Sequence, residues 1–220
     1  VRERTAQLEE ANKEMEAFSY SVSHDLRAPL RAIDGFSRMI VEDHAAGLDP
    51  EGRRLLGVVS ANARRMAQLI DDLLRLFRLR RSEVSFASVD MTALARTAFE
   101  EVVPDPETRA RIDLRMEGLP RAEGDPALLR QVWVNLLSNA VKFSAIREKP
   151  VIEIEGRVED RGAVFSVKDD GAGFDMAYAG ALFGPFQRLH RPSEFEGTGA
   201  GLALVKRIVL RHGGQVWAEG

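Results

Sequence analysis

The chain has 220 residues, of which 45% are hydrophobic and 30% are charged, a composition typical of a soluble chain able to bury one core or two. Its formal net charge of -3, from 31 basic and 34 acidic residues, lacks the basic excess of most nucleic-acid-binding domains. Cysteine is absent, which excludes disulfides, cysteine-ligated zinc and thiol catalysis. We therefore expect a cytoplasmic protein that does not bind nucleic acid.

Apolar runs in the chain stay short of the roughly 18 residues that a membrane-spanning helix needs, so we expect no direct membrane contact for this part of the protein. In residues 1–20, Leu8 and Met15 recur at the spacing of a heptad, with Ala11 and Phe18 between and after them and charged residues elsewhere. This pattern predicts a coiled-coil linker helix. Because the chain opens within the pattern, we expect an upstream sensor domain that is missing here, in a receptor that is either soluble or tethered to a membrane.

Helical periodicity continues past His24 as far as Ile40, and the run AAGLDPEG at residues 45–52 interrupts it. A second apolar stripe starts after Arg53 and reaches Phe77, with arginines on its other side. Residues 1–80 are therefore predicted to form an antiparallel helical hairpin. A lone hairpin cannot enclose its apolar stripe, so we expect a homodimer with a four-helix bundle; the alternative is that the stripe packs on the rest of the same chain.

Beyond residue 81 the pattern changes to short strands and amphipathic helices. The sequence predicts helices at residues 91–103, 126–143 and 200–212, and strands at residues 84–89, 111–116, 151–158, 163–169 and 215–220. This order predicts an α/β sandwich with helices on one face of a mixed sheet. The fold class is α+β, with a helical hairpin in residues 1–80 and the sandwich in residues 81–220.

His24 lies in the run SVSHDLRAPLRAIDGF on the first predicted helix. Asp25 beside it can accept a hydrogen bond from one ring nitrogen, which leaves the other nitrogen free to attack phosphorus. Pro29 removes the hydrogen-bond donor for the Asp25 carbonyl and should bend the helix. Taken alone, a histidine in a helix is more often structural, so the remaining motifs decide between the two interpretations.

Polar side chains form a row on the helix predicted from Pro126, which Asp125 should cap. Asn135, Asn139 and Lys142 are spaced by four and three residues and therefore share one helix face. Two amides and an ammonium suit a magnesium ion and the phosphates that it neutralises. The alternative is that the asparagines simply bond to neighbouring loops.

Two glycine-rich runs follow. In VKDDGAGF a strand ends at Asp169 and the chain turns through Gly171 and Gly173, where glycine allows close approach of a ligand and the carboxylate can accept from the exocyclic amine of adenine. A plain turn is the alternative.

The second run, EGTGAGLAL, leads through Gly197, Gly199 and Gly201 into a helix, whose free N–H groups favour phosphate. It matches neither the Walker pattern nor the dinucleotide fingerprint. The long connection at residues 174–196 is typical of a mobile lid, in which Phe183 and Phe186 are either anchors or core residues.

In order, SHDLRAP, NLLSNAVKFS, DDGAGF, LFGPFQR and GTGAGLAL resemble the H, N, G1, F and G2 boxes of sensor histidine kinases. The match covers essentially the whole chain and is most similar to the phytochrome-like and PAS-linked members. It implies a dimerisation and histidine-phosphotransfer hairpin at residues 1–80 and a catalytic ATP-binding domain, of the histidine kinase and chaperone ATPase type, at residues 81–220, without its last strand. ATP-dependent autophosphorylation would be followed by transfer to an aspartate of a response regulator receiver domain.

The resemblance makes His24 the phosphoacceptor and Asp25 its acid/base neighbour, with Mg²⁺ on Asn135 and Asn139. The receiver domain would dock beside His24 on surfaces such as Arg27 and Arg31. The resemblance also assigns ATP binding to Asn135, Asn139, Lys142, Phe143, Asp169, Gly171, Gly173, Phe183, Arg188, Gly197, Thr198, Gly199, Gly201 and Leu202.

Two positions refine the expected chemistry. Asn135 stands where the related chaperone and DNA-repair ATPases carry a glutamate that activates water, and an amide cannot act as a general base, so we expect poor ATP hydrolysis. Ala28 stands where many bifunctional members have threonine or asparagine, which predicts weak phosphatase activity toward the partner. The alternatives are a noncatalytic dimeric nucleotide-binding scaffold and a chaperone-type ATPase, which would need a glutamate near Asn135. Phosphorylation of His24 within one chain or across the dimer is equally compatible with the sequence.

Overall fold

The computed structural model describes residues 2–44, 47–78, 84–160, 162–191 and 194–220; the side chains of residues 2–20, 24 and 76–78 lie outside this description. The chain divides into two compact units, Val1–Arg80 and Arg81–Gly220. Within the described parts, none of the helices combines the length and the apolar character that a bilayer crossing requires.

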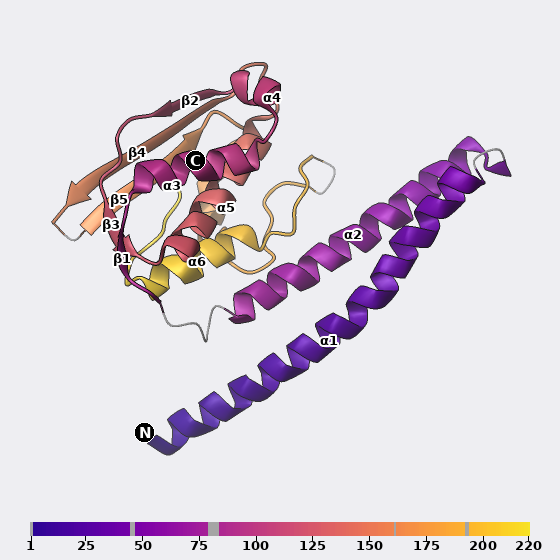
Figure 1. Cartoon of the computed structure of the whole chain (residues 1–220), viewed down its shortest axis with the longest axis horizontal. Helices are drawn as coiled ribbons and strands as arrows, with labels where there is room; N and C mark the ends of the chain where they lie inside the picture. Colours follow the sequence, from indigo (N-terminus) through magenta and orange to yellow (C-terminus); the bar gives the residue numbers. More distant parts are fainter. Residues whose placement is uncertain (1, 45–46, 79–83, 161, 192–193) are drawn as a thin grey trace. The chain divides into compact units, whose positions relative to one another are not determined.

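The first unit is a pair of long helices, α1 (Arg2–Asp43) and α2 (Pro50–Arg78), which contact each other along the hairpin (Figure 1). α2 begins three residues earlier than the sequence predicts. The reason is local: the Asp49 carboxylate accepts a hydrogen bond from the Gly52 backbone N–H at 2.7 Å, and Pro50 suits the first helical turn.

Polar contacts as well as apolar ones join the two helices. Ser60 Oγ donates to Asp34 Oδ1 at 2.5 Å, and Arg27 donates to Asp71 Oδ1 from Nε and Nη2 at 3.0 and 2.5 Å. Arg27 therefore forms an ion pair across the hairpin, while its side chain stays 32% exposed.

A single hairpin leaves much of its apolar stripe exposed. Leu30, Ala63 and Leu74 are buried, but Phe36 is 65% exposed. Eight further large apolar side chains of the hairpin are also exposed: Leu26, Ile33, Met39, Ile40, Leu55, Val58, Val59 and Met66. The stripe is therefore not covered within the hairpin itself.

The second unit is an α/β sandwich. The main sheet has the order β2-β4-β5, in which β2 is parallel to β4 and β4 antiparallel to β5, and β1 pairs with β3 in a small antiparallel sheet. The strands are β1 (Ala87–Val89), β2 (Asp113–Met116), β3 (Ala122–Gly124), β4 (Val151–Glu159) and β5 (Gly162–Asp169). The helices are α3 (Met91–Val102), α4 (Pro106–Ala110), α5 (Pro126–Ser144), the 3₁₀ helix η2 (Met176–Ala181) and α6 (Gly201–Arg211).

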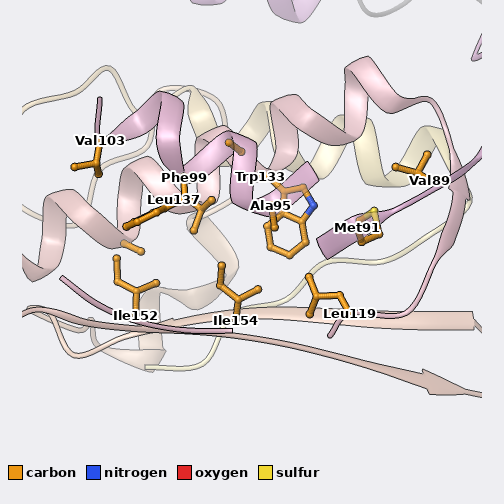
Figure 2. Packing of buried hydrophobic residues seen from close by; sticks show 12 residues of the cluster. Val89, Met91, Ala95, Phe99, Val103, Leu119, Trp133, Leu137, Ile152 and Ile154 are labelled. Atoms are coloured by element: carbon orange, nitrogen blue, oxygen red, sulfur yellow. The ribbon is translucent and has the colours of Figure 1, made fainter. Parts of the chain in front are cut away.

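The core lies between the helices and one face of the sheet. Figure 2 shows Ile152 and Ile154 extending from β4 toward Leu137 and Trp133 of α5, and all four are at most 2% exposed. Trp133 also packs edge-on against Phe165 of β5, with ring centroids 6.0 Å apart. α5 contacts both α3 and α6, so the core fixes the helix that carries the predicted polar row.

The predicted strand at residues 215–220 is absent: this segment has no strand pairing. It keeps the alternating burial of a strand, since Val216 and Ala218 are half-buried while Gln215, Trp217 and Glu219 are exposed. Alternation alone does not make a strand, because a ladder of hydrogen bonds to a neighbour is also needed. The sequence prediction was wrong here.

Asp125 joins the start of α5 to the end of α6. Its carboxylate accepts from the backbone N–H groups of Ala127, Leu128 and Ser85, and its own N–H donates to Nε2 of His212 at 3.0 Å. Nδ1 of His212 lies 2.8 Å from the Ile208 carbonyl, so the imidazole is neutral, with its proton on Nδ1. Burial opposes ionisation of Asp125, but the three backbone donors hold the pKa of this carboxyl below its ordinary value.

We expect Asp125→Ala to lower the free energy of unfolding of this unit by about 1–2 kcal/mol, the usual cost of a lost helix cap. Because the pKa is lowered in the folded state, this stabilisation is present above the ordinary aspartate pKa and is lost as the pH falls through the lowered one. Both tryptophans lie in this unit, so denaturation followed by their fluorescence measures it. Asp160→Ala, at an exposed turn, is the control; an equal loss there, or a loss for Asp125→Ala that persists in acid, would contradict the capping role.

Candidate functional site

Three polar side chains, those of Asn135, Asn139 and Lys142, lie along one face of α5. Asn135 Nδ2 donates to the Gln131 carbonyl at 2.7 Å, which leaves its Oδ1 available, and Lys142 Nζ donates to Asn139 Oδ1 at 3.2 Å. A Cβ on Gly201 would lie 2.8 Å from Asn135 Oδ1. A side chain at position 201 would therefore have to displace this amide, and the glycine where α6 begins leaves the amide in place.

Lys142 lies half-buried beside a second cation. Burial is the larger cause, and the nearby Arg188 guanidinium the smaller one, of the lowered pKa of the Lys142 ammonium. A Cβ on Gly197 would come within 3.3 Å of Lys142 Nζ. Two like charges therefore lie near each other at a partly buried, glycine-lined place, where an anion would relieve both the burial and the repulsion.

Two neighbouring aspartates at the end of β5, Asp169 and Asp170, make different contacts. Asp170 is structural, since its Oδ1 accepts from Val151 N at 3.1 Å and its carbonyl accepts from Arg147 Nε at 2.7 Å. Asp169 Oδ1 accepts from Gly171 N at 3.0 Å. Burial, with a smaller contribution from Asp170, raises the pKa of the Asp169 carboxyl despite that hydrogen bond.

Glycine is required at Gly171 and Gly199. A Cβ on Gly171 would lie 2.6 Å from the backbone carbonyl of Phe143. At Gly199, φ is +78°, and a Cβ would lie 2.5 Å from the Gln187 carbonyl. Gly171 therefore allows close approach of backbone to the end of α5, and Gly199 allows it to the connection at Gln187.

The connection at residues 174–196 is anchored through His190 and Phe195, which the sequence did not point to. Phe143 packs against His190 and Phe195 with centroids 5.2 and 5.0 Å apart, and those two rings are 5.1 Å from each other. Arg188 Nη2 donates to the Phe195 carbonyl at 2.5 Å. Phe186, which the sequence suggested as an anchor, is 39% exposed and has φ +60°.

The remaining predicted nucleotide residues lie on the same segments. Phe183 and Leu202 are half-buried, after η2 and in α6. Thr198 Oγ1 accepts from Ala200 N at 3.4 Å, and no side chain caps the start of α6. Gly173 has φ +62° with open space where a Cβ would lie.

The predicted phosphoacceptor lies in the other unit. His24 is within α1, but its side chain, and with it the predicted bond to Asp25, is outside the described residues. Among the described side chains, no group of three or more His, Cys, Asp or Glu could hold a metal ion. A magnesium ion would thus depend on the amide oxygens of Asn135 and Asn139, which are hard ligands of the kind it prefers, and on oxygens of its ligand.

Comparison with protein families assigns both units. Residues 14–82 match the His Kinase A (phospho-acceptor) domain, and residues 124–220 match the histidine kinase-, DNA gyrase B- and HSP90-like ATPase. The chain is a histidine kinase catalytic core. In this kinase core the glycine runs and the polar row of α5 all fall within the matched ATPase domain, and His24 falls within the matched phospho-acceptor domain.

Individual relatives agree with this assignment. The kinase core is 35% identical to cyanobacterial phytochrome B from Nostoc sp., over 97% of this chain and 28% of that protein. It is 37% identical to the methanogenesis regulatory histidine kinase FilI from Methanothrix harundinacea, over 100% of this chain and 24% of that protein. The chain thus spans about a quarter of the length of these curated relatives.

A solved structure agrees over nearly the whole chain. The crystal structure of full-length ShkA in complex with AMPPNP has a TM-score of 0.65 and 28% identity, covering 93% of this chain and 42% of that one. The bound AMPPNP belongs to the ShkA complex.

Proposed function

We propose that this kinase core binds ATP with Mg²⁺, phosphorylates His24 and passes the phosphoryl group to an aspartate of a response regulator receiver domain. The observation that carries the proposal is the pair of cations Lys142 and Arg188: Lys142 is half-buried and donates to Asn139 Oδ1 at 3.2 Å, and Arg188 is near enough to contribute to its lowered pKa. Such a pair is costly without an anion and favourable with one. The phosphates of ATP supply that anion in an ATPase domain of this family.

The residues of the second unit divide the recognition of the nucleotide. Asp169, at the end of β5, would accept a hydrogen bond from the exocyclic amine of adenine, with Gly171 and Gly173 allowing the base to approach. Phosphates would meet Lys142 and Arg188, together with the backbone N–H groups at the start of α6. Asn135 and Asn139 would hold Mg²⁺, which supplies neutralisation of the charge on the transferring phosphoryl group.

The chemical step joins the two units. A ring nitrogen of His24 attacks the terminal phosphorus, so that an N–P bond forms and the bond to the ADP oxygen breaks; Asp25 orients the ring and accepts from its other nitrogen. In the second step an aspartate oxygen of the receiver domain attacks the same phosphorus and the N–P bond breaks. Asn135 cannot activate water, so hydrolysis of ATP should compete poorly.

A homodimer completes the proposal. The apolar stripe that one hairpin leaves exposed, which includes Phe36 at 65%, would be covered by the stripe of a second copy in a four-helix bundle. We place the receiver domain beside His24, and the reaction in the cytoplasm, where ATP is available. The signal would arrive along α1 as a change in helix packing.

Two other functions make different predictions. A noncatalytic scaffold would bind nucleotide without turnover, yet Asp169, Asn139 and Lys142 retain the side chains that catalysis needs. A chaperone-type ATPase would need a general base at position 135, where this chain has an amide.

Incubation with ATP labelled at its terminal phosphate tests the proposal. We expect label on the protein only when Mg²⁺ is present, none after addition of a chelator, and loss of the label in acid but not in alkali, because a phosphoramidate is acid-labile. Bound nucleotide without any label on the protein would favour the scaffold. Rapid release of inorganic phosphate without labelled protein would favour the ATPase.

A further inference from the structure

Phe143 connects three parts of the nucleotide domain. Its backbone carbonyl is so close to Gly171 that only glycine fits there. Its ring packs against His190 and Phe195, which come from the connection that leads to the second glycine run. The closed set of three rings, Phe143, His190 and Phe195, is called the ring cluster below.

Each of the two cations is attached to the ring cluster. Lys142 Nζ lies 4.2 Å from the centroid of the Phe143 ring, a distance at which a cation is attracted to the face of an aromatic ring. Arg188 Nη2 donates to the Phe195 carbonyl at 2.5 Å. Gly199 also lies close to Arg188, since a Cβ on Gly199 would approach Arg188 Cγ to 3.1 Å.

The contacts of Lys142 and Arg188 with the ring cluster oppose the repulsion between these two cations. Arg188 contributes to the lowered pKa of Lys142, so their charges interact unfavourably when no anion lies between them. An arginine on a connection between elements would otherwise turn away into solvent. The packing of His190 and Phe195 on Phe143 keeps the backbone that carries Arg188 against the end of α5.

We propose that His190 and Phe195 are positioning residues for the nucleotide phosphates, because the ring cluster holds Arg188 next to Lys142 before the nucleotide arrives. This inference rests on the proposed function and deepens it. We assign the role of His190 to its ring, which contacts the rings of Phe143 and Phe195. The ring cluster therefore favours di- and triphosphates and makes no difference to a nucleoside.

The experiment measures the affinity of the full chain, with Mg²⁺, for a non-hydrolysable ATP analogue, for ADP and for adenosine by calorimetry. We expect His190→Ala to weaken binding of the two phosphorylated ligands about tenfold, the size expected from losing two ring contacts, and to leave adenosine unchanged. His190→Phe, which keeps a ring, should restore binding. His190→Gln, which keeps polar atoms without an aromatic ring, should not.

Phe86→Ala is the matched control, because Phe86 is an exposed ring of the same unit that packs edge-on against His212. It should leave all three affinities unchanged. Equal loss of adenosine binding in His190→Ala would overturn the inference, since the ring cluster would then support the base pocket or the fold. Rescue by glutamine but not by phenylalanine would also overturn it, as would unchanged binding of phosphorylated ligands. If the unsubstituted chain binds no nucleotide, the proposed function is wrong, whereas the other outcomes overturn only the role of the ring cluster.

Discussion

His24→Gln is expected to abolish phosphoryl transfer to the protein while leaving the affinity for ATP unchanged. The substitution removes the proposed nucleophile, and loss of a nucleophile lowers the rate by at least about a thousandfold when no other group replaces it. Every proposed nucleotide contact lies in the other unit, Arg81–Gly220, so binding should not change. Label on the protein and calorimetry with a non-hydrolysable analogue measure the two properties separately.

His44→Gln provides the matched control. His44 is an exposed histidine of the same hairpin, just after the end of α1, so it tests whether loss of any hairpin histidine has the same effect. We expect its labelling to match that of the unsubstituted chain. Acid-labile label that persists in His24→Gln, or disappears in His44→Gln, would show that the phosphoacceptor has been assigned to the wrong residue.

Asp169→Asn is expected to weaken ATP binding about 10- to 100-fold. A hydrogen bond to a charged acceptor contributes about 1.5–3 kcal/mol, and the amide replaces a full negative charge with a neutral oxygen. Asp170→Asn is the control, because its amide oxygen can still accept from Val151 N and the residue has no proposed contact with the base.

The pH dependence of ATP binding should follow Asp169. Burial raises the pKa of this carboxyl, and acceptance from the adenine amine needs the ionised form. Binding should therefore be full above the raised pKa and fall as the pH drops through it, at a higher pH than an ordinary aspartate would give. The loss should be absent in Asp169→Asn and present in Asp170→Asn; the same acid loss in all three proteins would contradict base recognition by Asp169.

Much of the fold could be predicted because long elements carry a periodic signal. α3, α5 and α6 bury one face each, so their apolar residues recur at helical spacing, and β4 and β5 alternate over enough residues to be recognised. β3, α4 and η2 are too short for a period. Residues 215–220 show the opposite error, since alternation was present and strand pairing was not.

The site shows a similar division. Helix spacing alone places Asn135, Asn139 and Lys142 on one face of α5, and the contact between Lys142 and Asn139 follows from it. The packing of His190 and Phe195 on Phe143 joins residues about 50 apart in the chain through tertiary structure, so no local pattern reveals it. The direction of the pKa shift at Asp169 depends on burial, which residue type and neighbours in sequence do not determine.

Arg27 gives a further example. The resemblance implies a partner-docking surface there, and the structure adds an ion pair with Asp71, which lies 44 positions away across the hairpin. The ion pair depends on the packing of α1 against α2, so no local pattern in the sequence reveals it.

Localisation of the phosphate by mass spectrometry tests the central claim most directly. The unsubstituted chain is incubated with Mg²⁺ and ATP, digested at alkaline pH to preserve a phosphoramidate, and its peptides are fragmented. We expect a phosphoryl group on His24 and on no other histidine. A phosphoryl group on another residue, with the His24 peptide unmodified, would contradict it.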